Sequence, residues 1–476
     1  MTMDLVRAAA GALLVFHDRF AHCFGRREAR GHALTYVRGL LLAEGRKSVE
    51  PIALAFAVAA DGGAAGREEV VALQGFITQS PWNAPDVQRE IQTLFAEELA
   101  PSAKKWSIGV VGVVDGSGFA KAGLESVGVQ PQYCGRLGKI ANCQVGEFLI
   151  GVTPDGCAIL DHQLYLPREW ISDAARRSKT HVPQDVVYHA QTEIAAELVR
   201  RTLSGGHVKF DWLTADAQYG DNGDFLDALE AAGQRYVVEV RAATTVWTVD
   251  PATQVPSYEG SGRPPSSPRR EAVRSVAEIA AELPPQAWQP VKLREGAKGP
   301  LVDQFARVRL WAVRHRKPGP PVWLLVRRSL DPKHPEIKYY ISNAGAQEPL
   351  EPLETMAHVA GVRWRVEEVL EDAKGHFGMA DYETRSWASW HHHMSLVAMA
   401  HLFVTLTKRK AQQEVPQITL DMAVRLLAAG LAKPTLTPET ALRLTEYHLT
   451  QNHIAHQSHR KTWLLKHQNI DPKVWL

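Results

Sequence analysis

Apolar residues recur at helical spacing over the first hundred residues of the chain. Leu5 to Phe24 and His32 to Ala43 each carry apolar side chains three or four positions apart, and Gly45 follows the second run. This period matches one face of an α-helix, and a glycine often ends a helix. The pattern therefore predicts a helical region over residues 1–105.

From residue 106 the pattern changes to continuous or alternating apolar runs, which are typical of strands. Ile108 to Val114 stops at Asp115, and Val208 to Ala215 stops at Asp216. The other elements expected here are strands at Gly123 to Cys134, Cys143 to Val152 and Tyr236 to Val240, and helices at Val186 to Thr202 and Asp224 to Ala232. Strands interleaved with helices predict a mixed α/β sheet over residues 106–240.

Residues 241–345 break this alternation of strands and helices. Pro256 to Arg270 is rich in Pro, Ser and Gly, which predicts a loop. Ala306 to Val313 and Val322 to Val326 predict a β-hairpin that turns at Lys317 to Pro321. We expect a β-rich insertion in this interval.

Helical spacing returns after the insertion and continues to the end of the chain. The expected fold class is therefore α/β, with a core interrupted by an insertion and flanked by helices. Its parts are a helical region at 1–105, a core at 106–240 and 346–408, a β-rich insertion at 241–345 and a helical tail at 409–476.

Charge is unevenly distributed, although the whole chain has a formal net charge of only +2. Residues 241–345 contain 17 Lys and Arg against 9 Asp and Glu. A basic segment on a nearly neutral protein suits a polyanion such as DNA, and it equally suits a solvated surface. Composition alone leaves both interpretations open.

The four cysteines show no CxxC spacing, which fits a reducing cytosol. The apolar run Met394 to Thr407 is too short to span a bilayer. We therefore expect a cytoplasmic protein with no membrane partner.

Two expected strands end on aspartates, and a third acidic candidate lies on an expected helix. Glu367 and Lys374 are seven residues apart and project from one face, and Arg363 lies one turn before Glu367. Two strand-end aspartates and a helical glutamate offer the carboxylate oxygens that Mg²⁺ prefers. Each residue alone has a simpler interpretation, because strand-end aspartates commonly cap turns and Arg363 to Lys374 could be a salt-bridge ladder.

Together these segments resemble the DDE transposases of bacterial insertion sequences, which belong to the RNase H-like superfamily. Arg363, Glu367 and Lys374 fit the spacing of a Tyr-x2-Arg-x3-Glu-x6-Lys signature, with Ala360 at the tyrosine position. A second acidic residue often follows the first Asp in relatives, and here that position is Gly116. The resemblance also rests on the segments Val114 to Lys121, Ser126 to Val129, Gln132 to Gly135, Gly138 to Ile140, Asn142 to Gln144, Leu164 to Pro167 and Thr214 to Gly220.

The resemblance implies an RNase H-like core with the β-rich insertion between Asp216 and Glu367. It implies that Asp115, Asp216 and Glu367 are catalytic and bind two Mg²⁺ ions, for which Mn²⁺ can substitute. Arg363 and Lys374 would contact DNA beside them. The implied reaction is cleavage at transposon ends followed by strand transfer of the 3′-OH into target DNA.

The same resemblance implies that the N-terminal helical region binds terminal inverted repeats in double-stranded DNA and that a homodimer pairs two ends in the bacterial nucleoid. The cations that it assigns to DNA contact are Arg26, Arg27, Arg30, Arg46 and Lys47. Two alternatives remain open from the sequence: a transposase-derived DNA-binding protein without cleavage activity, and a structure-specific nuclease of the same fold.

Overall fold

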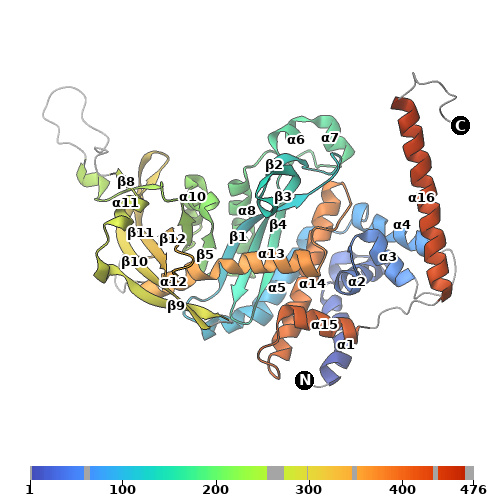
Figure 1. The fold of residues 1–476 in the computed structure, drawn as a ribbon, viewed down its shortest axis with the longest axis horizontal. Helices are drawn as coiled ribbons and strands as arrows, with labels where there is room; N and C mark the ends of the chain where they lie inside the picture. Colours follow the sequence, from blue (N-terminus) through green and yellow to red (C-terminus); the bar gives the residue numbers. More distant parts are fainter. Residues whose placement is uncertain are drawn as a thin grey trace.

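The computed structural model describes residues 3–57, 65–254, 273–296, 299–345, 351–431 and 438–466. Two β-sheets lie side by side, and helices pack around the first of them (Figure 1). The loop expected at Pro256 to Arg270 lies outside the described residues.

The central sheet is built around β1 (Val111–Ala120), which has a neighbour on each side. It runs antiparallel to β3 (Lys139–Thr153) and parallel to β5 (Trp212–Ala215). The other edge of β3 pairs with β2 (Gln130–Cys134) and with β4 (Gly156–Leu164). The expected α/β class is confirmed, and this order of strands agrees with an RNase H-like core.

Two of the expected strands in this sheet have other bounds than predicted, and a further strand was not predicted. β1 does not stop at Asp115 but continues to Ala120. The strand expected from Gly123 begins only at Gln130. β4, which the sequence analysis missed, is buried over Cys157 to His162 between β3 and the helices of the core.

The second sheet has seven strands among the described residues, and it continues from the core rather than forming a separate body. Its edge strand is β6 (Val237–Val240), which pairs with β12 (Ile337–Ser342) and also touches β5 through a bridge between Leu213 and Tyr236. The strands that follow β6 in the chain are β7 (Thr245–Trp247), β8 (Val273–Ser275), β9 (Gln289–Gly296), β10 (Gly299–Arg314) and β11 (Lys317–Ser329).

The hairpin between β10 and β11 turns at an unexpected place. Its two-residue loop is His315 and Arg316, which have φ angles of 50° and 63°. Two successive positive φ angles match the twist of antiparallel strands. The expected turn at Lys317 to Pro321 is therefore wrong, because these residues already belong to β11.

Helices enclose the central sheet, and α14 (Trp387–Ala411) is the most deeply buried of them. It is buried on nearly all sides and packs against β4 and the N-terminal helices. Within the described residues, no helix has the length and apolar character needed to cross a membrane. The remaining helices are α1 (Met3–Arg19), α2 (Arg27–Leu42), α3 (Val49–Ala57), α4 (Ala65–Thr78), α5 (Ala84–Leu94), α6 (Arg168–Ser172), α7 (Ala174–Lys179), α8 (Gln191–Ser204), α9 (Ala217–Gly220), α10 (Gly223–Ala231), α11 (Val276–Ala281), α12 (Leu353–Val362), α13 (Trp364–His376), α15 (Leu420–Gly430) and α16 (Pro438–Lys466).

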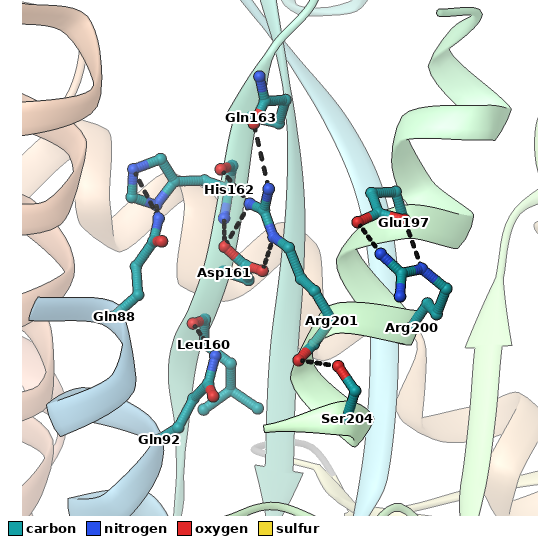
Figure 2. A network of polar contacts seen from close by, with 10 residues as sticks. All are labelled: Gln88, Gln92, Leu160, Asp161, His162, Gln163, Glu197, Arg200, Arg201 and Ser204. Carbon is teal, nitrogen blue, oxygen red and sulfur yellow. Dashed lines mark hydrogen bonds and ion pairs between the residues drawn. The ribbon is translucent and has the colours of Figure 1, made fainter. Parts of the chain in front are cut away.

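A buried polar network fixes two of these helices against β4 (Figure 2). The Asp161 carboxylate accepts a hydrogen bond of 2.6 Å from the Arg201 guanidinium of α8. On the other side, Gln88 of α5 contacts the His162 ring, and Gln92 donates to the Leu160 carbonyl at 3.2 Å. The network joins the N-terminal helices to the sheet that carries the acidic residues.

Candidate active site

Two of the three acidic candidates lie on neighbouring parallel strands. Val114 of β1 pairs with Ala215 of β5; Asp115 is the next residue of β1, and Asp216 directly follows the end of β5. Asp216 also caps the short helix α9, because its carboxylate accepts from the Gln218 backbone N–H at 2.8 Å. The sheet register therefore brings the two half-buried aspartates together.

The third candidate comes from a distant part of the chain. Glu367 lies in the first turn of α13, which crosses the centre of the molecule beside β1 (Figure 1). It lines one cleft of about 1230 Å³ together with Asp115 and Asp216. The next residue, Glu368, forms an ion pair of 2.8 Å with Arg365 on another face of the helix.

The proximity of the carboxylates alters the ionisation of Asp115. Burial, followed by the negative charge of Asp216, raises the pKa of Asp115 to about 7, and Glu367 acts in the same direction. Confining like charges away from water disfavours the ionised form. A cation in the cleft would remove this penalty.

Two basic side chains border the acidic group, as the helical spacing predicted. The Arg363 guanidinium lies 2.9 Å from the Glu367 carboxylate and 3.5 Å from that of Glu239 on β6. The Lys374 ammonium lines the cleft and donates a 2.7 Å hydrogen bond to the Ser117 hydroxyl. The structure thus gathers Asp115, Asp216, Glu367 and Lys374 in one cleft, with Arg363 bound to Glu367.

A fourth carboxylate, which the sequence analysis missed, also lines the cleft. Glu147 of β3 is fully buried, and Tyr219 of α9 donates a hydrogen bond to its Oε2 atom. Burial and the charges of Asp115 and Asp216 raise the pKa of Glu147 to about 8, against the opposing effect of the Tyr219 hydrogen bond. A lone glutamate within the apolar run Val145 to Ile150 was the signal that could have identified it, because burying a charge is costly.

The donor set of the cleft fits hard divalent cations. Carboxylate oxygens are the ligands that Mg²⁺ and Mn²⁺ prefer. The Oε1 atom of Glu147 is buried and finds no hydrogen-bond partner in the part of the chain that the structure describes. Such an orphaned acceptor beside two further carboxylates is the arrangement expected where a cation completes the site. Asp115, Asp216 and Glu367 are the residues that would hold it.

The five N-terminal cations lie outside the residues that line the cleft. Arg26, Arg27 and Arg30 are exposed, and Arg46 forms a 2.7 Å ion pair with Glu383. Lys47 differs from them, because its ammonium donates to the Leu40 and His376 carbonyls at the ends of two helices. Its bonds give Lys47 a structural position, whereas the four arginines face solvent.

The alanine at the tyrosine position of the signature is explained by packing. Ala360 is buried in α12, with 5% of its surface exposed. The methyl group of Ala360 is enclosed by packing and carries no hydroxyl, so the contact that a tyrosine would make there is absent from the described site.

Comparisons with known proteins identify one matching family. A model described as DDE superfamily endonuclease matches residues 19–300, which is more than half of the chain. The matched segment contains Asp115 and Asp216 and ends before Glu367. No curated protein matches the sequence.

Among solved structures, the cryo-EM structure of the piggyBac transposase synaptic complex with hairpin DNA is similar over 88% of this chain and 76% of that chain. The sequence identity is 10% and the TM-score is 0.39. A likeness this distant carries no conclusion about function.

Proposed function

The chain belongs to the DDE superfamily of endonucleases, and from this premise we propose that it is a DNA transposase with its active site at Asp115, Asp216 and Glu367. One observation carries the proposal. Three carboxylates from β1, the end of β5 and α13 line one cleft although more than 250 residues of sequence separate the first from the last. Structural ion pairs do not require such convergence of like charges.

The proposed reaction is cleavage of a phosphodiester bond at a transposon end, followed by attack of the freed 3′-OH on target DNA. Two bound Mg²⁺ ions, or Mn²⁺ in their place, would supply activation of the attacking oxygen and charge stabilisation of the leaving oxygen. Asp115 and Asp216 would hold them from the sheet, and Glu367 from the helix.

The basic residues beside the carboxylates would position the DNA strand. The Lys374 ammonium, fixed by Ser117, presents a point charge to a phosphate inside the cleft. Arg363 holds Glu367 through an i,i+4 ion pair and so sets the direction of the third carboxylate. Neither side chain needs to move from its position in the structure to do this.

Recognition of the DNA ends would use surfaces outside the cleft. We assign phosphate contacts to the exposed Arg26, Arg27, Arg30 and Arg46, and leave Lys47 a structural role. Pairing of two transposon ends requires two active sites, so the proposed working form is a homodimer on double-stranded DNA. These contacts would weaken as salt rises, because phosphate binding releases counterions.

The test is incubation of the full chain and Mg²⁺ with DNA that carries the ends flanking its own coding region. The proposal expects cleaved ends and products that join donor and target DNA. Cleavage without joined products would support a structure-specific nuclease instead. End binding without any cleavage in Mg²⁺ or Mn²⁺ would support a DNA-binding protein that has lost activity.

A further inference from the structure

Glu147 lies where the edge of β1 opens into the cleft. β5 pairs with β1 only over Val111 to Val114, so β1 has no partner from β5 beside Gly116. Across the other edge of β1, Glu147 of β3 stands directly opposite Gly116. The glutamate therefore lies beside a position that has no side chain, one residue beyond Asp115.

The space at Gly116 is taken up by the Glu147 carboxyl group. A Cβ atom on residue 116 would lie 3.1 Å from the Glu147 Oε1 atom and 3.4 Å from the Tyr219 hydroxyl. A contact of this length is tight for a methyl group. The missing side chain of Gly116 is therefore what allows the Glu147 carboxyl to reach the cleft from the neighbouring strand.

The two oxygens of this carboxyl group have different surroundings. Oε2 accepts a hydrogen bond from Tyr219, which is itself buried. Oε1 is buried and has no hydrogen-bond partner among the described residues. Tyr219 thus holds the group by one oxygen and leaves the other without a partner, at the wall of the cleft that Asp115 and Asp216 also line.

Burying the Glu147 carboxyl group lowers the stability of the fold, and this loss needs an explanation. A buried carboxyl group with one unsatisfied oxygen destabilises a protein, because that oxygen has lost its hydrogen bonds to water and gained none in return. An apolar side chain would fill the same strand position at no such cost, since Val145 and Leu149, which face the same side of β3, are apolar and buried. Carboxylates that are retained at such a cost commonly serve a site.

We propose that Glu147 is a fourth carboxylate of the divalent-cation site, held in position by the hydroxyl of Tyr219. The inference rests on the proposed function, because it assigns a further ligand to the same cation site. Its Oε1 atom completes the shell that Asp115, Asp216 and Glu367 form from the other sides of the cleft. Tyr219 is a positioning residue that acts through Glu147.

The proposal is tested by the affinity for Mn²⁺ of the full chain, measured from the free-Mn²⁺ signal in electron paramagnetic resonance without DNA. Glu147→Gln removes the charge and keeps the shape, and we expect it to weaken binding by about 10- to 100-fold. Tyr219→Phe should weaken binding in the same direction while Glu147 remains. Glu197→Gln is the matched control, since this exposed glutamate of α8 forms an ion pair with Arg200 and lies outside the residues that line the cleft, and its affinity should equal that of the unmodified chain.

Thermal unfolding in EDTA separates a cation ligand from a structural hydrogen-bond acceptor. If Glu147 is a cation ligand, Glu147→Gln should melt at the same temperature as the unmodified chain or higher. If Glu147 is a structural hydrogen-bond acceptor, the variant should melt at a clearly lower temperature. Mn²⁺ affinity that is unchanged in both Glu147→Gln and Tyr219→Phe would overturn the proposal while leaving the proposed function intact. If the unmodified chain itself binds no Mn²⁺, the proposed function fails, and the inference fails with it.

Discussion

The Lys374 ammonium donates a hydrogen bond of 2.7 Å to the Ser117 hydroxyl, and this contact joins α13 to β1 two residues beyond Asp115. Residues two apart in a strand face the same side. The lysine is therefore fixed on the side of the strand that presents Asp115, within the cleft that Glu367 also lines.

Substitution of Lys374 tests whether this contact positions DNA. We expect Lys374→Ala to lower the rate of end cleavage by about 100-fold, the scale of a misplaced reacting group. Binding of end DNA should change far less, because it depends on many phosphate contacts. Single-turnover cleavage and a gel-shift titration measure the two effects. Ser117→Ala, which removes only the tether, should have a smaller effect in the same direction, and a normal cleavage rate in Lys374→Ala would contradict the assignment.

Arg363 holds two carboxylates, and the geometry of its guanidinium is needed for both. It contacts Glu367 at 2.9 Å and Glu239 at 3.5 Å. Lysine offers a single point charge in place of the planar fork. We therefore expect Arg363→Lys to raise the Mg²⁺ concentration that gives half-maximal cleavage. Arg365→Lys is a matched control on another face of α13, where Arg365 forms an ion pair with Glu368, and it should leave the Mg²⁺ requirement unchanged.

The order of these elements could largely be predicted from the sequence, because periodicity reports burial directly. The end of β5 at Asp216 and the face of α13 that carries Glu367 and Lys374 followed from strand and helix spacing. The position of Asp115 inside β1 did not. Its neighbours Gly116, Ser117 and Gly118 resemble a turn, but the glycines instead make room for Glu147 of β3 and Cys134 of β2.

The same limit explains the misplaced hairpin. The segment Lys317 to Pro321 has the composition of a turn but lies in β11. β12 pairs with β11 only from Trp323 onward, so this segment has a partner on one side and can tolerate prolines. The continuation of β1 past Asp115 and the place of Lys317 to Pro321 in β11 both depend on which strands pair, and local sequence does not carry that information.

Buried histidines make the fold sensitive to acid. Burial lowers the pKa of His393 to about 3 and that of His401 to about 4. In the unfolded chain each ring takes up a proton near pH 6.5, so the unfolded state binds more protons below that pH. Their contribution to stability is therefore complete above about pH 7 and declines as the pH falls from about 6.5 towards 4, by about 1.4 kcal/mol per pH unit for each ring.

Denaturant unfolding between about pH 7.5 and about pH 5 measures this decline. His401→Leu should reduce the slope, because it removes one of the buried rings, and the Nδ1 atom of that ring has no hydrogen-bond partner among the described residues. A free energy of unfolding that stays constant over this range would contradict the account.

The Asp161–Arg201 pair predicts a large effect on stability without a direct effect on chemistry. Asp161 is buried, whereas the Arg201 side chain keeps 33% of its surface exposed. We expect Asp161→Asn to lower the free energy of unfolding by about 3 kcal/mol, the low end for a broken buried pair, because water still reaches Arg201. Glu197→Gln, on the helix that carries Arg201, removes a surface ion pair and should lower the free energy of unfolding by less than about 1 kcal/mol. Equal losses in the two variants would contradict the role given to burial.

The most direct test of the active-site assignment is end cleavage in Mg²⁺ by Asp115→Asn, Asp216→Asn, Glu367→Gln and the adjacent control Glu368→Gln, each alongside a measurement of DNA binding. The assignment predicts that the first three variants bind end DNA but do not cleave it, and that Glu368→Gln cleaves as the unmodified chain does. Near-normal cleavage by Glu367→Gln, or loss of cleavage in Glu368→Gln alone, would contradict it.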